Sequence, residues 1–135
     1  EYQVLGFQIT RLHNFMVKYD CPCLAFVQLN RDGITREDTG TIAGSDRLAW
    51  LCTSFTVFKV KAPEEIGEDG RENGDRKLCP VMSRHGGGLD EGDYVSVKMF
   101  GEYGRLEEGQ TRNEIHNSDQ GFETDIDEGE DLIHL

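Results

Sequence analysis

A continuous apolar run near the start of the chain restricts the possible folds more than any other feature. Residues Cys23–Val27 are all apolar, and the polar Gln28 follows at once. A strand with one face in solvent alternates apolar and polar side chains, whereas a short unbroken run is typical of a strand covered on both faces, as in a parallel sheet. Before it, apolar residues recur at helical spacing over about residues 4–19, and Pro22 ends that helix. This order predicts an α/β domain.

The rest of the pattern favours a mixed, mostly parallel sheet with a C-terminal β-hairpin, because alternating helix and strand signals give way to strands joined by short turns. The expected elements are a long glycine-containing loop at 32–47, a strand within Leu48–Val60 with room for a helical turn at its start, a surface excursion at Ala62–Asp75, a strand at Lys77–Met82, a turn at Ser83–Gly88 and a return strand at Tyr94–Phe100.

Negative charge is concentrated at the C-terminal end. Residues 107–135 carry 10 acidic side chains and one basic side chain, a net charge of −9, so residues 1–106 account for −3 of the total of −12. We therefore predict a domain over 1–106 and a disordered acidic tail over 107–135. Because most of the charge lies in the tail, the negative total does not exclude local contacts with DNA. The tail is either solubilising or a docking segment with the apolar anchors Phe122, Ile126, Leu132 and Ile133.

The sequence gives no signal for a membrane or a metal. It contains no secretory signal and no apolar run long enough to span a bilayer. The histidines show no ligand spacing, and the cysteines lack the spacing of a zinc knuckle. We expect buried, reduced thiols at Cys21, Cys23, Cys52 and Cys79.

Three segments, taken in order, resemble the motor domain of DnaB-type replicative DNA helicases of the phage type. Pro22–Arg31 is similar to the family's strand that ends in Gln-Leu-Asn-Arg, and Arg36–Arg47 resembles the acidic, glycine-containing loop after it. Met82–Gly86 is similar to a late strand that carries Arg, a polar residue and Gly. The resemblance covers about residues 5–106. It implies the C-terminal half of a RecA-like ATPase core, working in the cytoplasm of a bacterial or phage-infected cell as a homo-hexameric ring on single-stranded DNA.

Gln28 is the first candidate site residue. In open α/β sheets ligands bind at the C-terminal ends of the strands, and a neutral amide there can hydrogen-bond a γ-phosphate or its attacking water. The resemblance implies that Gln28 senses the γ-phosphate and signals to the loop that follows. The alternative is an amide that caps backbone groups at a strand end.

The glycine-containing loop is the candidate DNA interface. Small residues let backbone N–H groups approach phosphate oxygens, and arginine supplies charge, which suits contacts that are independent of base sequence. The alternative is a solvated loop in which an arginine pairs with a neighbouring acid. The candidate DNA-binding residues are Arg31, Arg36, Thr39, Gly40, Thr41 and Arg47.

Arg84 is the candidate for catalysis. The resemblance implies an arginine finger that acts on the nucleotide of the neighbouring subunit, and such fingers contribute on the order of 10³–10⁵-fold in rate. The alternative is an arginine at a strand end in a surface ion pair. Met82 stands where the family has a lysine, so a second cationic contact is absent at that position.

The nucleotide itself is expected to be ATP with Mg²⁺. By analogy with the family, Tyr94 and Lys59 are candidates for contacts with the base, although core packing of Tyr94 and a solvent-facing Lys59 are the simpler alternatives. The chain contains no G-x-x-x-x-G-K-[ST] sequence and no apolar strand that ends in an aspartate for magnesium. We therefore expect a fragment that is inactive alone, with the main phosphate-binding loop elsewhere.

Two other classes stay open at this level. One is half of a RecA-like recombinase or regulatory ATPase, which would share the sensing glutamine but not the finger geometry of Arg84. The other is a non-catalytic DNA-binding or assembly module, which the missing phosphate loop favours. A primase or a polymerase is a further expected partner, through the acidic tail.

Overall fold

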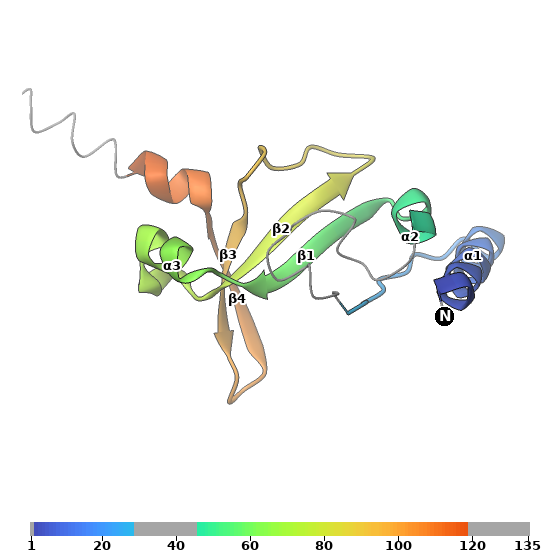
Figure 1. The fold of residues 1–135 in the computed structure, drawn as a ribbon, viewed down its shortest axis with the longest axis horizontal. Coiled ribbons are helices and arrows are strands. Elements are labelled where there is room, and N and C mark those ends of the chain that lie inside the picture. Colours follow the sequence, from blue (N-terminus) through green and yellow to red (C-terminus); the bar gives the residue numbers. More distant parts are fainter. Residues whose placement is uncertain (1, 29–45, 119–135) are drawn as a thin grey trace, which may run out of the picture. The chain divides into compact units, whose positions relative to one another are not determined.

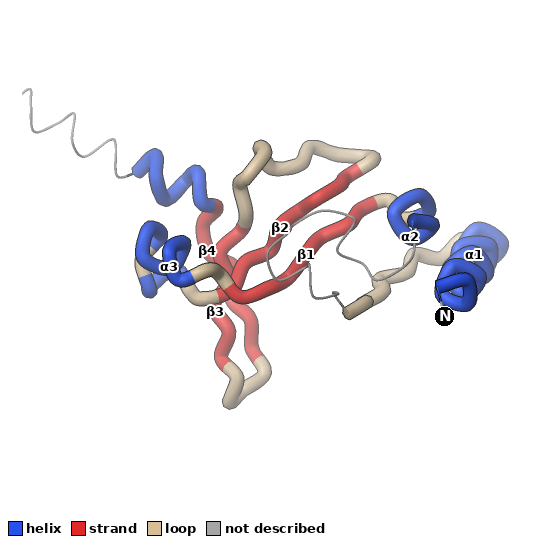
Figure 2. Tube along the Cα trace, viewed as in Figure 1, coloured by secondary structure: helices blue, strands red, loops and turns tan. Residues whose placement is uncertain are grey.

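The computed structural model describes residues 2–28 and 46–118 (Figures 1 and 2). Their elements, in order, are α1 (Tyr2–Tyr19), α2 (Asp46–Leu51), β1 (Ser54–Val60), α3 (Pro63–Asp69), the 3₁₀ turn η3 (Arg71–Asn73), β2 (Arg76–Ser83), β3 (Val95–Phe100), β4 (Arg105–Thr111) and a helix at 112–118. The contacts of the chain divide it into two compact units. The first holds the residues up to Val57 with Pro80–Gly88, and the second holds Phe58–Cys79 with the residues from Leu89 onward.

The four strands form one antiparallel sheet in the order β1–β2–β3–β4. β2 pairs antiparallel with β3, and β3 with β4. At one end of the β1–β2 pair the N–H of Arg84 donates to the carbonyl oxygen of Thr53, and at the other end the N–H of Lys61 donates to that of Asp75, both at 2.9 Å. These bonds show that β1 and β2 are antiparallel too.

The protein is therefore a mixed α/β structure, but the expected mostly parallel sheet is not found among the described strands. Each connection leads to the next strand in sequence order, so the chain turns back at every step. A parallel pair needs a crossover from one end of the sheet to the other. The strand at Lys77–Met82 and the return strand of the hairpin are confirmed, as β2 and β3. The expected turn at Ser83–Gly88 is confirmed only in part, because Ser83 belongs to β2 and the connection runs over residues 84–94. Leu48–Val60 contains the expected strand, preceded by the short helix α2.

The prediction of a doubly covered strand at Cys23–Val27 is wrong. Residues 21–28 have no regular secondary structure, and the side chains of Leu24 and Phe26 are 82% and 88% exposed. A strand needs neighbours for its N–H and C=O groups, and none of the described strands pairs with this segment. The helix before it is confirmed as α1, which ends at Tyr19, shortly before Pro22.

Two polar stretches contain regular structure that their composition hides. α3 and η3 lie within the expected surface excursion, whereas β4 begins at Arg105 and continues, with the helix at 112–118, into the expected disordered tail. The tail prediction is thus wrong for 107–118, because backbone pairing with β3 orders a segment of low hydropathy. Residues 119–135, with the four apolar anchors of the tail, lie outside the described residues.

Buried apolar side chains are few and belong to each unit separately. Phe55 and Val57 alternate with exposed residues along β1 and are buried in the first unit. The larger set lies in the second unit and consists of Cys79, Tyr94, Val97 and Ile115.

Gly74 fixes the approach of the η3–β2 connection to β3. Its φ is +90°, in the left-handed region that side chains disfavour, and a Cβ placed there would overlap the carbonyl oxygen of Val97. Glycine is therefore required at this point by both conformation and space.

Two further expectations concern membrane-spanning helices and the burial of the cysteines. Within 2–28 and 46–118, no helix has the length and apolar character needed to cross a membrane. Of the four cysteines Cys79 is buried, Cys21 and Cys52 are half-buried, and Cys23 is exposed. The expectation of buried thiols is therefore correct for Cys79 and wrong for Cys23, since the strand that would have buried Cys23 does not form.

Candidate functional site

The C-terminal end of α2 is held by the side chain of Arg84. Its Nε donates to the carbonyl oxygen of Cys52 at 2.9 Å, and its Nη2 donates to those of Ala49 at 3.0 Å and Trp50 at 2.9 Å. The backbone bond from Arg84 to Thr53 fixes the start of this side chain beside the start of β1. Arg84 thus directly follows β2 and binds the last turn of α2 with three hydrogen bonds. We call this arrangement the Arg84 cap.

The physical basis of the Arg84 cap is the unpaired end of a helix. The last four carbonyl groups of a helix lack partners inside it and carry a partial negative charge, which a cation stabilises. The Arg84 side chain is exposed, and its partners among the described residues are carbonyl oxygens, not the carboxylate of the ion-pair alternative. A surface guanidinium held by neutral acceptors keeps its full charge for an oxyanion. Its action on a neighbour's nucleotide stays a prediction.

Of the candidate DNA-binding residues, one lies within the described part of the chain. Arg47 is exposed on α2, and its Nη1 lies 3.4 Å from the Oγ1 of Thr10 on α1. Thr10 in turn donates to the carbonyl oxygen of Gly6 at 2.9 Å. α2 therefore carries Arg47 in its first turn and is bound by Arg84 at its last. The others, Arg31, Arg36, Thr39, Gly40 and Thr41, lie outside the described residues.

Gln28 does not occupy the position expected for a phosphate sensor. Its side chain is exposed and belongs to the irregular segment 21–28, not to the end of a strand. Gln28 does not lie at a strand end because the strand expected at Cys23–Val27 does not form. Its proposed role as a sensor is untested.

The second unit contains a buried charged cluster centred on Asp69, which we call the Asp69 cluster. The Oδ2 of Asp69 accepts hydrogen bonds from the Nζ of Lys61 at 2.8 Å and from the hydroxyl of Tyr94 at 2.6 Å. Its Oδ1 lies 3.2 Å from the Nε2 of His116. Lys61 also donates to the Oγ of Ser96 at 2.9 Å. These bonds join the end of α3, the residue after β1, strand β3 and the helix at 112–118.

The ring of Tyr94 lies among three cations. The Nζ of Lys77 is 4.8 Å and that of Lys61 5.4 Å from the ring centroid, and the guanidinium carbon of Arg112 is at 5.9 Å. These distances lie within the range in which a cation is attracted to the face of an aromatic ring. An acid pairs with each of two of these cations: Lys77 with Glu65 at 2.6 Å, and Arg112 with Glu68 at 2.8 Å.

The hydrogen bonds also determine the protonation states of the Asp69 cluster. Burial alone would raise the pKa of Asp69, but the hydrogen bonds from Lys61 and Tyr94, the charge of Lys61 and the bond with His116 hold that pKa below its ordinary value. Burial raises the pKa of Tyr94 far above its ordinary value, and the hydrogen bond to Asp69 and its charge raise it further. At neutral pH the cluster therefore contains an ionised carboxylate and a protonated phenol.

The centre of the Asp69 cluster is buried, whereas the side chain of His116 at its edge is 39% exposed. The side chains of Lys61 and Asp69 are fully buried, and Tyr94 is 1% exposed. Tyr94 is thus packed in the core, as the simpler alternative for this residue has it, and it offers no face to a nucleotide base. Lys59, the other candidate for base contacts, is half-buried in β1. The hydrogen bonds of the Asp69 cluster hold α3 and the helix at 112–118 against β3.

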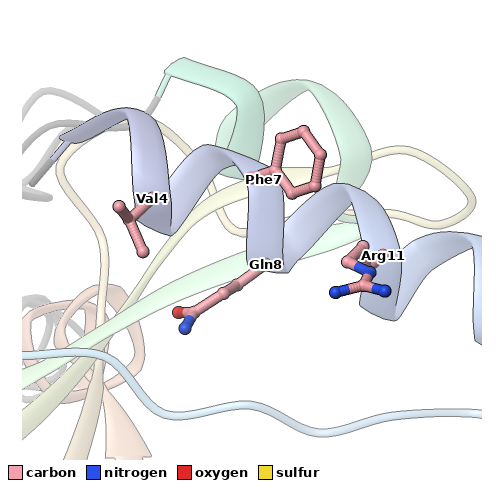
Figure 3. Close-up of a pocket in the computed structure, with 4 residues that line it drawn as sticks. All are labelled: Val4, Phe7, Gln8 and Arg11. Carbon is pink, nitrogen blue, oxygen red and sulfur yellow. The ribbon is translucent and has the colours of Figure 1, made fainter.

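Helix α1 presents an apolar surface. Val4, Phe7, Gln8 and Arg11 line a hollow on it, at the spacing of one helical face (Figure 3). All four residues come from α1, and no other element among the described residues lines the hollow. Large apolar side chains that are exposed on α1 and in segment 21–28 include Val4, Phe7, Phe15, Val17, Tyr19, Leu24 and Phe26.

The sequence contains signals for the elements that carry the Asp69 cluster. Pro63 at the first helical position, followed by two acids, is a typical start of a helix, and the side chain of Glu65 accepts a hydrogen bond from the N–H of Ala62 at 2.8 Å. Thr111 and Glu114 form a capping box, in which each side chain accepts from the other's N–H, at 3.2 and 2.9 Å. The first signal marks the start of the helix that ends at Asp69, and the second marks the start of the helix that carries His116.

Comparisons with protein-family models, curated proteins and solved structures gave no match for this chain. Among the described residues, no group of three or more His, Cys, Asp or Glu side chains is placed to hold a metal ion. The functional assignment therefore depends on the chemistry of the residues described above.

Proposed function

We propose that this chain is part of an ATP-dependent DnaB-type replicative helicase, which moves on single-stranded DNA as a hexameric ring. The observation that carries the proposal is an exposed arginine, Arg84, at the end of β2, held in a defined position by three backbone carbonyls. A finger needs surface exposure to reach a neighbour's nucleotide, and the carbonyl bonds hold the exposed Arg84 at the end of β2 before it engages one. The motifs Pro22–Arg31, Arg36–Arg47 and Met82–Gly86 follow one another in the order of the family.

In this proposal the chain supplies groups that respond to a nucleotide held by other residues. Arg84 neutralises charge on the transferring phosphoryl group of the neighbouring subunit. Gln28 senses the γ-phosphate, and the loop that leads into α2 contacts the DNA backbone. The phosphate-binding loop and the aspartate for magnesium, which this sequence lacks, belong to the nucleotide-binding half of the RecA-like core.

The test is the DNA-stimulated ATPase activity of the chain assembled with that nucleotide-binding half. We expect Arg84→Ala to lower kcat on the order of 10³-fold or more with little change in KM, because the finger acts on the transition state. Arg105→Ala is the matched control, since Arg105 is an exposed arginine that pairs with Glu107 in β4. Equal kcat values for the two variants would refute the proposal, and so would an assembly that shows no DNA-stimulated hydrolysis.

A second candidate, a non-catalytic assembly module, is favoured by a different observation. Phe7 on α1 is 64% exposed and lies among other exposed apolar side chains, and large exposed apolar patches mark sites of association. Phe7→Asp should then abolish association measured by sedimentation, whereas Gln110→Asp, at an exposed position of β4 outside α1, should not. A module of this kind would keep all its activity in the Arg84→Ala variant, which separates it from the helicase.

A further inference from the structure

We propose that Arg84 alternates between two partners, the carbonyl groups at the end of α2 and a phosphoryl oxyanion, so that binding of the anion releases the Arg84 cap. The inference rests on the proposed function and adds regulation to it: the finger is occupied by the protein's own backbone until a phosphate competes for it. The ligand class is a phosphate or diphosphate group.

The first argument concerns which hydrogen bonds the guanidinium makes. Nε and Nη2 together serve three carbonyl oxygens, those of Ala49, Trp50 and Cys52. An arginine binds a phosphate most strongly through two parallel N–H groups. A guanidinium offers two such pairs, Nε with Nη2 and Nη1 with Nη2, so Nη2 belongs to both. The two edges that contain these nitrogens therefore cannot engage a phosphate fully while they hold the helix end.

The second argument concerns relative strength. A carbonyl oxygen carries a partial charge, whereas a phosphate oxygen carries a formal one, and a phosphate can also accept two parallel N–H bonds from one guanidinium. The Arg84 cap is exposed, so water can replace the carbonyl bonds at little cost. Exchange of partners is consequently favourable when a phosphate reaches Arg84, and the apparent affinity is reduced by the fraction of capped molecules.

The third argument concerns what the exchange changes. α2 has six residues, too few for a stable isolated helix, so its last turn depends on contacts such as the Arg84 cap. The bond from the N–H of Cys52 to the carbonyl oxygen of Leu48, at 3.0 Å, closes that turn. Loss of the Arg84 cap therefore loosens the end of α2, while Arg47 in its first turn keeps its link to Thr10.

The test is amide hydrogen exchange of the full chain with and without sodium pyrophosphate, at constant ionic strength. A bound ligand normally slows exchange at its site, but here we expect the Cys52 amide to exchange faster, by roughly two- to fivefold, the range for loss of a cation at a helix C-terminus. Arg84→Ala should show that faster exchange without pyrophosphate and no further change with it. Arg105→Ala should behave as the unmodified chain.

A second readout comes from Trp50, which is the single tryptophan of the chain and whose carbonyl accepts from Arg84. Its fluorescence in the Arg84→Ala variant should match that of the unmodified chain saturated with pyrophosphate. Slower or unchanged exchange at Cys52 on pyrophosphate binding would overturn the proposal, and so would absence of binding. Either result would leave the finger itself to be judged by kcat in the assembled ATPase, so the two proposals fail separately.

Discussion

Replacement of Asp69 by alanine is the most severe single change that the structure predicts for the second unit. It removes the acceptor of the bonds from Lys61 and Tyr94 and the partner of His116. Lys61 then stays 3% exposed, with the hydroxyl of Ser96 as its remaining hydrogen-bond acceptor among the described residues. The change therefore leaves a buried charge without a counter-ion.

The expected cost follows from that unpaired charge. Breaking a buried ion pair by removing one partner costs about 3–5 kcal/mol, a large part of the roughly 5–15 kcal/mol that stabilises a typical domain. Asp75→Ala is the matched control, because Asp75 pairs with Arg76 at 2.7 Å while its side chain is 55% exposed. Pairs of that kind contribute about 0–1 kcal/mol.

The assay is urea unfolding followed by circular dichroism, with the free energy of unfolding extrapolated to water. We expect Asp69→Ala to lower it by at least about 2 kcal/mol more than Asp75→Ala does. The double variant Lys61→Met/Asp69→Leu should recover much of the loss, since it removes both charges together. Equal destabilisation by Asp69→Ala and Asp75→Ala would refute the view that the Asp69 cluster holds the second unit together.

Three further predictions use other parts of the structure. Gly74→Ala should lower the free energy of unfolding by about 1–3 kcal/mol, through left-handed strain and overlap with Val97, and urea unfolding measures it. Folding lowers the pKa of Asp69, so its contribution to stability is complete above about pH 4 and is lost as the pH falls further. Folding raises the pKa of Tyr94, so its contribution is complete below about pH 10 and is lost as the pH rises further. Thermal unfolding measured across pH tests both expectations. Gln28→Ala in the assembled ATPase should uncouple hydrolysis from DNA binding, and an unchanged stimulation by DNA would contradict its role as a sensor.

The sequence predicted those elements whose apolar pattern is satisfied by neighbours within the described chain. β1 alternates buried and exposed residues, and β2 pairs with β3 through a register that includes Lys77 with Ser96. Local pattern and pairing agree there, so both the strands and the hairpin were predictable.

The run Cys23–Val27 shows why the same reasoning failed elsewhere. An apolar pattern states that a segment needs cover, but it does not supply the partner strand, and none of the described strands pairs with this run. The opposite error occurred at β4 and the helix at 112–118. Most of their side chains are polar, and they are ordered by backbone pairing with β3, by the capping box of Thr111 and Glu114 and by burial of Ile115.

The candidate sites divide in the same way. Arg84 could be identified from the sequence because the strand before it, β2, is predicted by its apolar pattern. Its hydrogen bonds to α2 depend on the tertiary structure and could not be predicted. The Asp69 cluster could not be predicted, since its members come from four separate elements and their pairing depends on the fold. Lys61 and Asp69 read as ordinary surface charges in the sequence, yet both are buried.

The most direct test of the helicase proposal is a subunit-mixing experiment. Rings are assembled from unmodified subunits and Arg84→Ala subunits in varying ratio, and DNA-stimulated ATP hydrolysis is measured at constant total protein. If Arg84 acts on the nucleotide of the neighbouring subunit, each variant subunit impairs a site that is otherwise intact, and in a coupled ring activity falls more steeply than the fraction of unmodified subunits. Activity that declines in simple proportion to dilution would contradict the proposal.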